Sequence, residues 1–95
     1  MDLGLKNKVI VVTGGSKGIG GGIVCLLANE GAIPVILGRN KESIFKAIID
    51  YKQNGYEVGY AIAELTNPNQ CEAAIDSIIK NYGRIDGLVN NAGVN

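Results

Sequence analysis

The stretch KVIVVTGGSKGIGGGIVCLLA (Lys8–Ala28) decides the fold class of this chain. It opens on a continuous apolar run, which is typical of a parallel strand covered on both faces. Six glycines follow within the ten residues from Thr13 to Gly22, and the apolar residues after them have the pattern of a helix. Glycine costs about 1 kcal/mol relative to alanine inside a helix. A helix that begins so poorly indicates a loop shaped for a ligand rather than for stability.

Short β-branched runs alternate with longer amphipathic ones along the rest of the chain. Such alternation predicts parallel strands joined by right-handed helical crossovers, with helices on both sides of the sheet. The fold class is therefore α/β, a Rossmann-type doubly wound parallel sheet of order βαβαβαβ in three α/β/α layers. The expected strands are Lys8–Thr13, Ile33–Gly38, Tyr56–Ala63 and Ile85–Asn91, and the expected helices are Gly18–Glu30, Lys41–Lys52 and Asn67–Gly83.

The last two helices each show a one-sided apolar pattern that predicts a buried face. The residues of these faces are Ile44, Phe45, Ile48 and Ile49 in the first, and Ala74, Ile75, Ile78 and Ile79 in the second. Pro34 lies near the start of its strand, where a missing backbone donor is tolerated.

Composition limits the function classes. The 95 residues are 46% hydrophobic and 19% charged with a net charge of zero, as in a globular domain or part of a larger one. The neutral balance argues against nucleic acid and against an anionic membrane surface. No apolar run approaches the roughly 18 residues of a membrane span, and the first residues carry no signal-peptide core, so a cytoplasmic location is expected.

The two cysteines, Cys25 and Cys71, have no metal-ligand or redox spacing. Each falls inside an expected helix, where we predict a small buried hydrophobe. The chain has no histidine, so no metal site is expected.

The glycine stretch lies where ligands bind in an open parallel sheet, beyond the carboxyl end of a strand. A helix N-terminus presents free N–H groups and partial positive charge, and glycine lets a diphosphate approach the backbone. The alternative is a glycine-rich turn without a ligand. The strand before the loop and the helix after it favour a dinucleotide site. No Gly-Lys-Ser/Thr follows at the spacing of a nucleoside triphosphatase loop.

The spacing resembles that of the short-chain dehydrogenase/reductase family. Thr13 to Gly20 match its TGxxxGIG pattern, Asn90 to Gly93 match its NNAG segment, and Glu64-Leu65-Thr66 match the acidic-Leu-Thr turn after the third strand. The resemblance covers the whole chain. It implies an NAD(P)-dependent oxidoreductase that transfers hydride between a nicotinamide and an alcohol/carbonyl pair.

The same resemblance implies particular residue roles. The glycine-loop residues would line the pyrophosphate and its neighbouring ribose, while Thr13 would tie the loop to the NNAG segment. Glu64 stands where the family has an Asp that contacts the adenine, and its side chain is one methylene longer. Leu65 can present its backbone there. Gly21 and Gly22 replace side chains common in the family, and close packing on the sheet is the expected reason. The expected cofactor-binding positions are Gly14, Ser16, Lys17, Ile19, Gly20, Arg39, Glu64, Leu65, Asn91, Ala92 and Gly93.

The end of the second strand bears on the choice of coenzyme. An NAD enzyme carries an acidic side chain there for the ribose 2′-hydroxyl. This chain has Gly38 followed by Arg39, whose planar fork of donors suits a 2′-phosphate, and Lys17 adds a second cation. We therefore expect a preference for NADP over NAD, the alternative being that both cations are ordinary surface residues.

The family's catalytic Tyr-xxx-Lys is missing: none of Tyr51, Tyr56, Tyr60 and Tyr82 has a lysine four positions later. We expect residues 1–95 to be the dinucleotide-binding first part of a larger domain, inactive alone and prone to self-association through its last strand. The resemblance implies a small alcohol/carbonyl substrate and a homo-oligomer. Local similarity to L-fucose-type dehydrogenases indicates a sugar. A non-catalytic dinucleotide sensor and a ligand-free scaffold are the alternatives.

Overall fold

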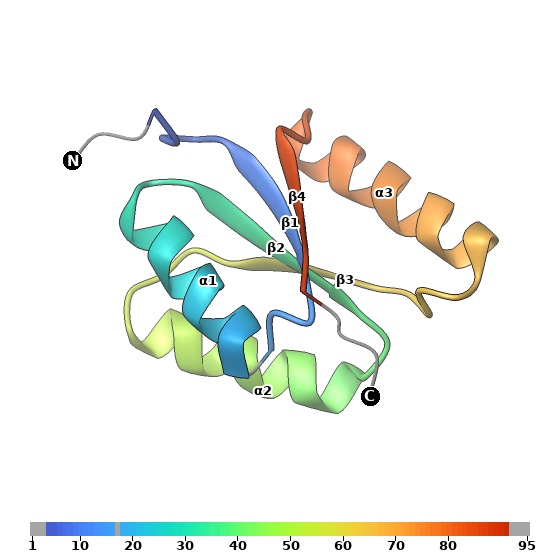
Figure 1. Cartoon of the computed structure of the whole chain (residues 1–95), viewed down its shortest axis with the longest axis horizontal. Coiled ribbons are helices and arrows are strands. Elements are labelled where there is room, and N and C mark those ends of the chain that lie inside the picture. The colour runs from blue at the N-terminus through green and yellow to red at the C-terminus, as the bar shows by residue number, and fades with distance from the viewer. Residues whose placement is uncertain (1–3, 17, 92–95) are drawn as a thin grey trace.

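The computed structural model describes residues 4–16 and 18–91. Strands and helices alternate along the chain in the expected order (Figure 1). The elements are β1 (Val9–Thr13), α1 (Gly18–Asn29), β2 (Ile33–Gly38), α2 (Lys41–Gln53), β3 (Gly59–Ile62), α3 (Pro68–Tyr82) and β4 (Gly87–Asn90).

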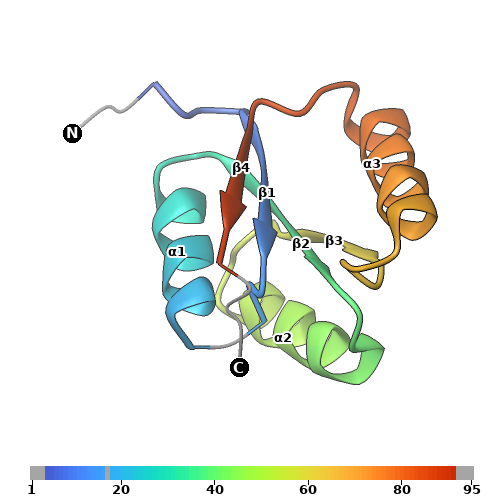
Figure 2. The same ribbon diagram turned by 45° about the vertical axis from the view of Figure 1, so that its right-hand side comes forward.

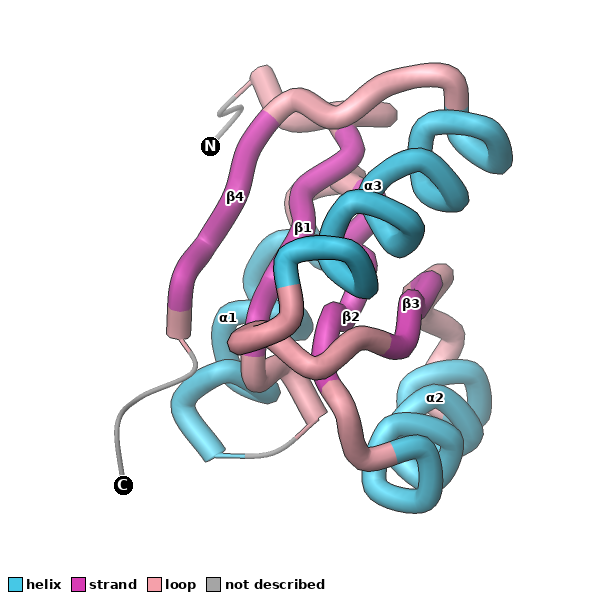
Figure 3. The backbone as a smooth tube through the Cα atoms, turned by 90° about the vertical axis from the view of Figure 1, so that its right-hand side faces the viewer, coloured by secondary structure: helices cyan, strands magenta, loops and turns pink. Residues whose placement is uncertain are grey.

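The strands of the described part form one parallel sheet in the order β3-β2-β1-β4. The order reverses at β1, which lies between β2 and β4, so the expected doubly wound topology is confirmed. Helices α1 and α2 cover one face of the sheet and α3 covers the other (Figures 2 and 3). The three-layer arrangement follows because each strand has an apolar residue facing either side.

The core consists of one apolar layer on each face of the sheet. Alternate residues of β1 divide between them: Val9 and Val11 pack toward α3, and Ile10 and Val12 pack toward α1 and α2. Every residue of β1 is buried. The continuous apolar run of the sequence thus becomes an inner strand of the sheet, and the glycine loop begins at the end of this fully buried strand.

The third strand is shorter than expected, covering Gly59–Ile62 instead of Tyr56–Ala63. The register pairs Val35 of β2 with Gly59, so Val58 would stand opposite Pro34. The Ile33 N–H donates to the Lys8 carbonyl oxygen, on the side of β2 that faces β1. The backbone groups of successive residues in a strand point to opposite sides, so the position of the N–H that Pro34 lacks faces β3. The ladder therefore stops at Gly59.

The apolar faces of α2 and α3 are only partly covered. Phe45, Ile49 and Ile79 are 43%, 58% and 46% exposed, whereas burial was expected. In α2 the covered stripe runs through Ile44 and Ala47. Neighbouring positions on a helix lie about 100° apart, so the residues beside this stripe turn toward solvent.

Burial of the cysteines was also wrongly expected. Cys25 and Cys71 are both partly exposed and both free thiols. The Cys71 thiol lies 3.6 Å from the carbonyl oxygens of Glu64 and Leu65, at the rim of α3 rather than beneath it. No helix in the described ranges is long and apolar enough to cross a bilayer.

Candidate functional site

Four loops meet at one edge of the sheet, where the parallel strands present their carboxyl ends. The glycine loop follows β1, Arg39 follows β2, Glu64 follows β3 and Asn91 follows β4. The loop after β1 and the end of β4 lie side by side near the start of α1 (Figures 1 and 2). Sequence reasoning placed its site residues on these loops, and the topology brings the loops to one edge.

The glycine loop requires glycine for two different physical reasons. Gly14 and Gly18 have φ of +70° and +65°, a backbone conformation that side chains disfavour. At Gly15 and Gly20 there is no room for a Cβ atom. A Cβ on Gly15 would lie 2.9 Å from Val24 Cγ2, and one on Gly20 would collide with the Gly14 carbonyl oxygen. The loop is thus folded tightly against α1 with bare backbone at its surface.

The loop fits an anionic group. It leads into the N-terminus of α1, a helix of 12 residues whose first turn carries no acidic side chain. By contrast, α2 has Glu42 in its first turn, and this negative charge interacts favourably with the positive end of the helix dipole. Free N–H groups, an uncompensated helix dipole and the absence of Cβ atoms are what a diphosphate requires. The residues present therefore fit a dinucleotide.

Thr13 closes the site between β1 and β4. Its Oγ1 accepts a hydrogen bond from the Asn91 backbone N–H at 2.9 Å and lies 3.1 Å from Asn90 Oδ1. The Asn91 side chain reaches the glycine loop, because a Cβ on Gly20 would lie 2.6 Å from Asn91 Nδ2. The predicted tie between Thr13 and the NNAG segment is thereby confirmed for the residues that the structure describes.

Arg39 and Glu64 form an ion pair at the next strand ends. Arg39 Nη1 lies 3.2 Å from Glu64 Oε2, and Thr66 Oγ1 donates to Glu64 Oε1 at 3.2 Å. The hydrogen bond from Arg39, assisted by Thr66, lowers the pKa of Glu64. The Arg39 side chain is 77% exposed, so water screens the pair and Arg39 can exchange Glu64 for another anion at small cost.

For the other expected site residues that lie in the described ranges, the structure gives the position and exposure of the side chain but no polar contact within the site. Ser16 is half-buried in the glycine loop, and Ile19, in the first turn of α1, is 80% exposed. Leu65 is 38% exposed beside Glu64. Lys17, Ala92 and Gly93 lie outside the described residues.

The explanation expected for Gly21 and Gly22 is wrong. A Cβ on Gly22 would have no atom within 4 Å, and one on Gly21 would meet the hydroxyl of Tyr51 at 3.2 Å, not the sheet. Tyr51 is a residue that sequence reasoning missed. Its hydroxyl reaches the loop from α2 and donates to the Gly15 carbonyl oxygen at 2.8 Å. The sequence signal that could have pointed to such a contact was Gly21, a glycine inside a helix at a position where the family commonly has a side chain.

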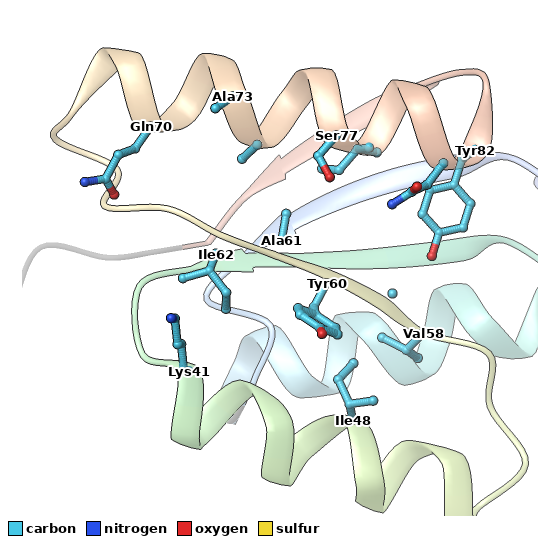
Figure 4. A pocket seen from close by; sticks show the side chains of 14 residues that line it. Lys41, Ile48, Val58, Tyr60, Ala61, Ile62, Gln70, Ala73, Ser77 and Tyr82 are labelled. Carbon is cyan, nitrogen blue, oxygen red and sulfur yellow. The ribbon is translucent and has the colours of Figure 1, made fainter.

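A groove of about 800 Å³ lies on the far strand of the sheet and away from the glycine loop (Figure 4). It runs along β3 between α2 and α3, with Ile48, Tyr60 and Ser77 among its lining residues. The groove is the gap that two helices on opposite faces leave at a sheet edge. The helix starts that border it are capped by side chains, that of α2 by Asn40 and that of α3 by Asn67, so we place the candidate site at the glycine loop.

Known proteins resemble this chain over nearly its whole length. The family model for short chain dehydrogenase matches residues 8–95. The 3-oxoacyl-[acyl-carrier-protein] reductase FabG of Chlamydia muridarum is 40% identical over 91 residues, covering 95% of this chain and 37% of the relative. L-sorbose reductase of Gluconobacter frateurii, solved in complex with NADPH and L-sorbose, superposes with a TM-score of 0.88 at 35% identity over 99% of this chain and 36% of its own.

A solved xylitol dehydrogenase with bound NAD⁺ superposes with a TM-score of 0.86 at 32% identity, covering 95% of this chain and 35% of its own. The chain therefore spans about a third of the length of these relatives. The likeness lies in the part that carries the glycine loop and the first four strand ends. One of the two structures holds NADPH and the other NAD⁺.

Proposed function

The chain belongs to the short-chain dehydrogenase family, and from that premise we propose that it forms the dinucleotide-binding part, residues 1–95, of an NAD(P)-dependent oxidoreductase. The observation that supports the proposal most is the loop from Gly14 to Gly20. Its backbone is bare where side chains cannot fit, and it opens into a helix whose first turn carries no acidic side chain. Among ligands of this family, a coenzyme diphosphate has the charge that such a loop stabilises.

The residues at the four strand ends would each contact a different part of the coenzyme. The glycine loop would bind the diphosphate through its amides, and Ser16, Lys17 and Ile19 would lie beside the adjoining ribose. Leu65 would offer its backbone near the adenine, and Asn91, Ala92 and Gly93 would flank the coenzyme from β4. A bound nicotinamide supplies the hydride acceptor or donor for an alcohol/carbonyl pair. A sugar or sugar-like alcohol is the proposed substrate class.

We further propose a preference for NADP, which rests on Arg39. The position after β2 has no carboxylate to repel a 2′-phosphate, and the guanidinium is exposed. Its present partner, Glu64, holds it at 3.2 Å on the same edge as the glycine loop. A 2′-phosphate would compete with Glu64 for the same planar fork of donors and win by its greater charge. Before coenzyme binds, Glu64 is thus a partner of Arg39 rather than of the adenine.

A comparison of the two coenzymes tests the proposal. Titration of the protein with NADPH and NADH should give a lower Kd for NADPH. Arg39→Ala should raise the NADPH Kd at least 10-fold, because it removes a hydrogen-bonded charge pair with the phosphate. The NADH Kd should stay within about 2-fold of wild type. An unchanged NADPH Kd in this variant contradicts the preference. Absence of binding of either coenzyme at millimolar concentration contradicts the dinucleotide site. A cytoplasmic location and a homo-oligomer remain predictions.

A further inference from the structure

Tyr51 connects α2 to the glycine loop across the molecule. Its hydroxyl donates to the Gly15 carbonyl oxygen at 2.8 Å, over 36 positions of sequence. The side chain is half-buried. This burial raises the pKa of Tyr51, and the nearby Cys25 and Asp50 act in the same direction. The hydroxyl therefore stays protonated, and able to donate, throughout the neutral range.

The glycine run of α1 leaves a passage for this hydroxyl. A Cβ atom on Gly21 would lie 3.2 Å from the Tyr51 oxygen, a tighter approach than side chains normally accept. The next residue, Gly22, faces open space. Of these two adjacent glycines, only Gly21 would bring a Cβ atom against Tyr51.

The contact has a direct consequence for the loop's donors. A peptide unit is planar and trans, so the Gly15 carbonyl oxygen and the Ser16 N–H point in opposite directions from one rigid plane. A hydrogen bond that fixes the carbonyl therefore also fixes the direction of the Ser16 N–H. On its other side Gly15 packs against the core, where a Cβ atom would meet Val24 and Ile36.

We propose that Tyr51 is a positioning residue for the coenzyme: its hydroxyl holds the Gly15–Ser16 peptide plane in place before the coenzyme binds, and Gly21 is a glycine because it admits that hydroxyl. The inference rests on the proposed dinucleotide site. Preorganised donors bind more tightly because the ligand does not have to order them. The tyrosine acts through the backbone and does not itself touch the reacting atoms.

Removal of the hydroxyl alone is the first arm of the test. Tyr51→Phe keeps the ring and should raise the Kd of NADPH, followed by its fluorescence, about 3- to 10-fold, as expected for one lost hydrogen bond. The Kd of NADH should rise by the same factor, because the loop serves the part that both coenzymes share. Tyr60→Phe is the matched control. Tyr60 is 46% exposed on β3, distant from the loop, and its variant should keep the wild-type Kd.

The two glycines form the second arm, which remains informative if Tyr51→Phe folds poorly. Gly22→Ala should raise Tm, because alanine favours the helix. Gly21→Ala should raise Tm less, because its Cβ atom also displaces the Tyr51 hydroxyl. Only Gly21→Ala should also raise the NADPH Kd, about 2- to 5-fold, because its Cβ pushes the hydroxyl away from Gly15. A merely structural role for Tyr51 would lower the Tm of Tyr51→Phe and leave the NADPH Kd of both folded variants unchanged.

The outcomes separate this inference from the proposed function. Wild-type protein that binds NADPH, with Tyr51→Phe and Gly21→Ala binding equally well, overturns the positioning role and leaves the dinucleotide site standing. Wild-type protein that binds neither coenzyme overturns the site, and the positioning role with it. Weaker binding in both variants, with Gly22→Ala and Tyr60→Phe unchanged, supports the role.

Discussion

The surroundings require a glycine at position 20 but not at position 22. A side chain at Gly20 would collide with the Gly14 carbonyl and with Asn91, both part of the site. We predict that Gly20→Ala destabilises the protein by about 1–3 kcal/mol, the usual cost of overpacking. Gly22→Ala, which meets open space, should stabilise it by about 1 kcal/mol. Urea unfolding of the two variants measures both changes, and equal effects would contradict this assignment of the glycines.

Sequence reasoning succeeds at the residue scale where one residue acts through its own backbone, or where a family motif already implies the contact. The positive φ of Gly14 follows from a tight turn between a strand and a helix, and the Thr13 tie follows from a motif shared with a known family. It fails where two segments must first be docked. The contact between Tyr51 and Gly21 depends on how α2 lies against α1, which no spacing along the chain reveals. The Arg39–Glu64 pair likewise requires β2 and β3 to be neighbours.

At the scale of elements, α3 covers one face of the described sheet (Figure 2), so its N-cap contributes to the stability of the fold. Asn67 Oδ1 accepts hydrogen bonds from the backbone N–H groups of Asn69 and Gln70. Asn67→Ala should therefore lower the free energy of unfolding by about 1 kcal/mol. Asn69→Ala, in the same turn but outside the cap, is the control. Equal unfolding midpoints for the two variants would rule out the capping role.

The junction of β1 and β4 carries an ionic contact that makes stability depend on pH. The Asp86 carboxylate accepts from the Val9 N–H at 2.8 Å and from Arg84 at 2.6 and 2.7 Å. The hydrogen bond from Arg84, and then that from Val9, lower the pKa of Asp86 below its ordinary range. A lowered pKa means that this contribution to stability is complete above the unfolded pKa and is lost as pH falls through the folded one.

We therefore predict that wild-type stability declines from about pH 4 downward, and that Asp86→Asn shows a shallower decline over the same range. At pH 7 the variant should be less stable than wild type. Thermal unfolding followed between pH 2 and pH 7 measures the difference. Parallel curves for the two proteins would show that Asp86 contributes nothing to the acid response.

The order of elements could be predicted from the sequence because strands and helices differ in their hydrophobic period and are separated by turn residues. The ends of β3 could not be. Pro34 was recognised as tolerable in its own strand, but its missing N–H shortens the neighbouring strand instead. Burial of Phe45 and Ile49 was overestimated for a similar reason, because the width of a buried helix face depends on what lies opposite it.

For the molecule as a whole, the exposed side of β4 is the feature with the clearest consequence. Within the described residues β4 pairs with β1 alone, and Leu88 is 64% exposed. Open strand edges and exposed apolar side chains favour association. We predict that the 95-residue chain self-associates and that Leu88→Lys shifts it toward monomer. Sedimentation velocity over a range of concentrations measures this, and a clean monomer of the wild type at high concentration would disprove it.

The central claim is that a nicotinamide dinucleotide docks its diphosphate on the amides of the glycine loop, and backbone amide NMR during an NADPH titration tests it most directly. The account predicts saturable shifts concentrated at Gly14–Gly20, with smaller ones at Arg39 and Asn91. Shifts confined to the groove along β3, around Tyr60 and Ser77, or none at millimolar NADPH, would contradict it.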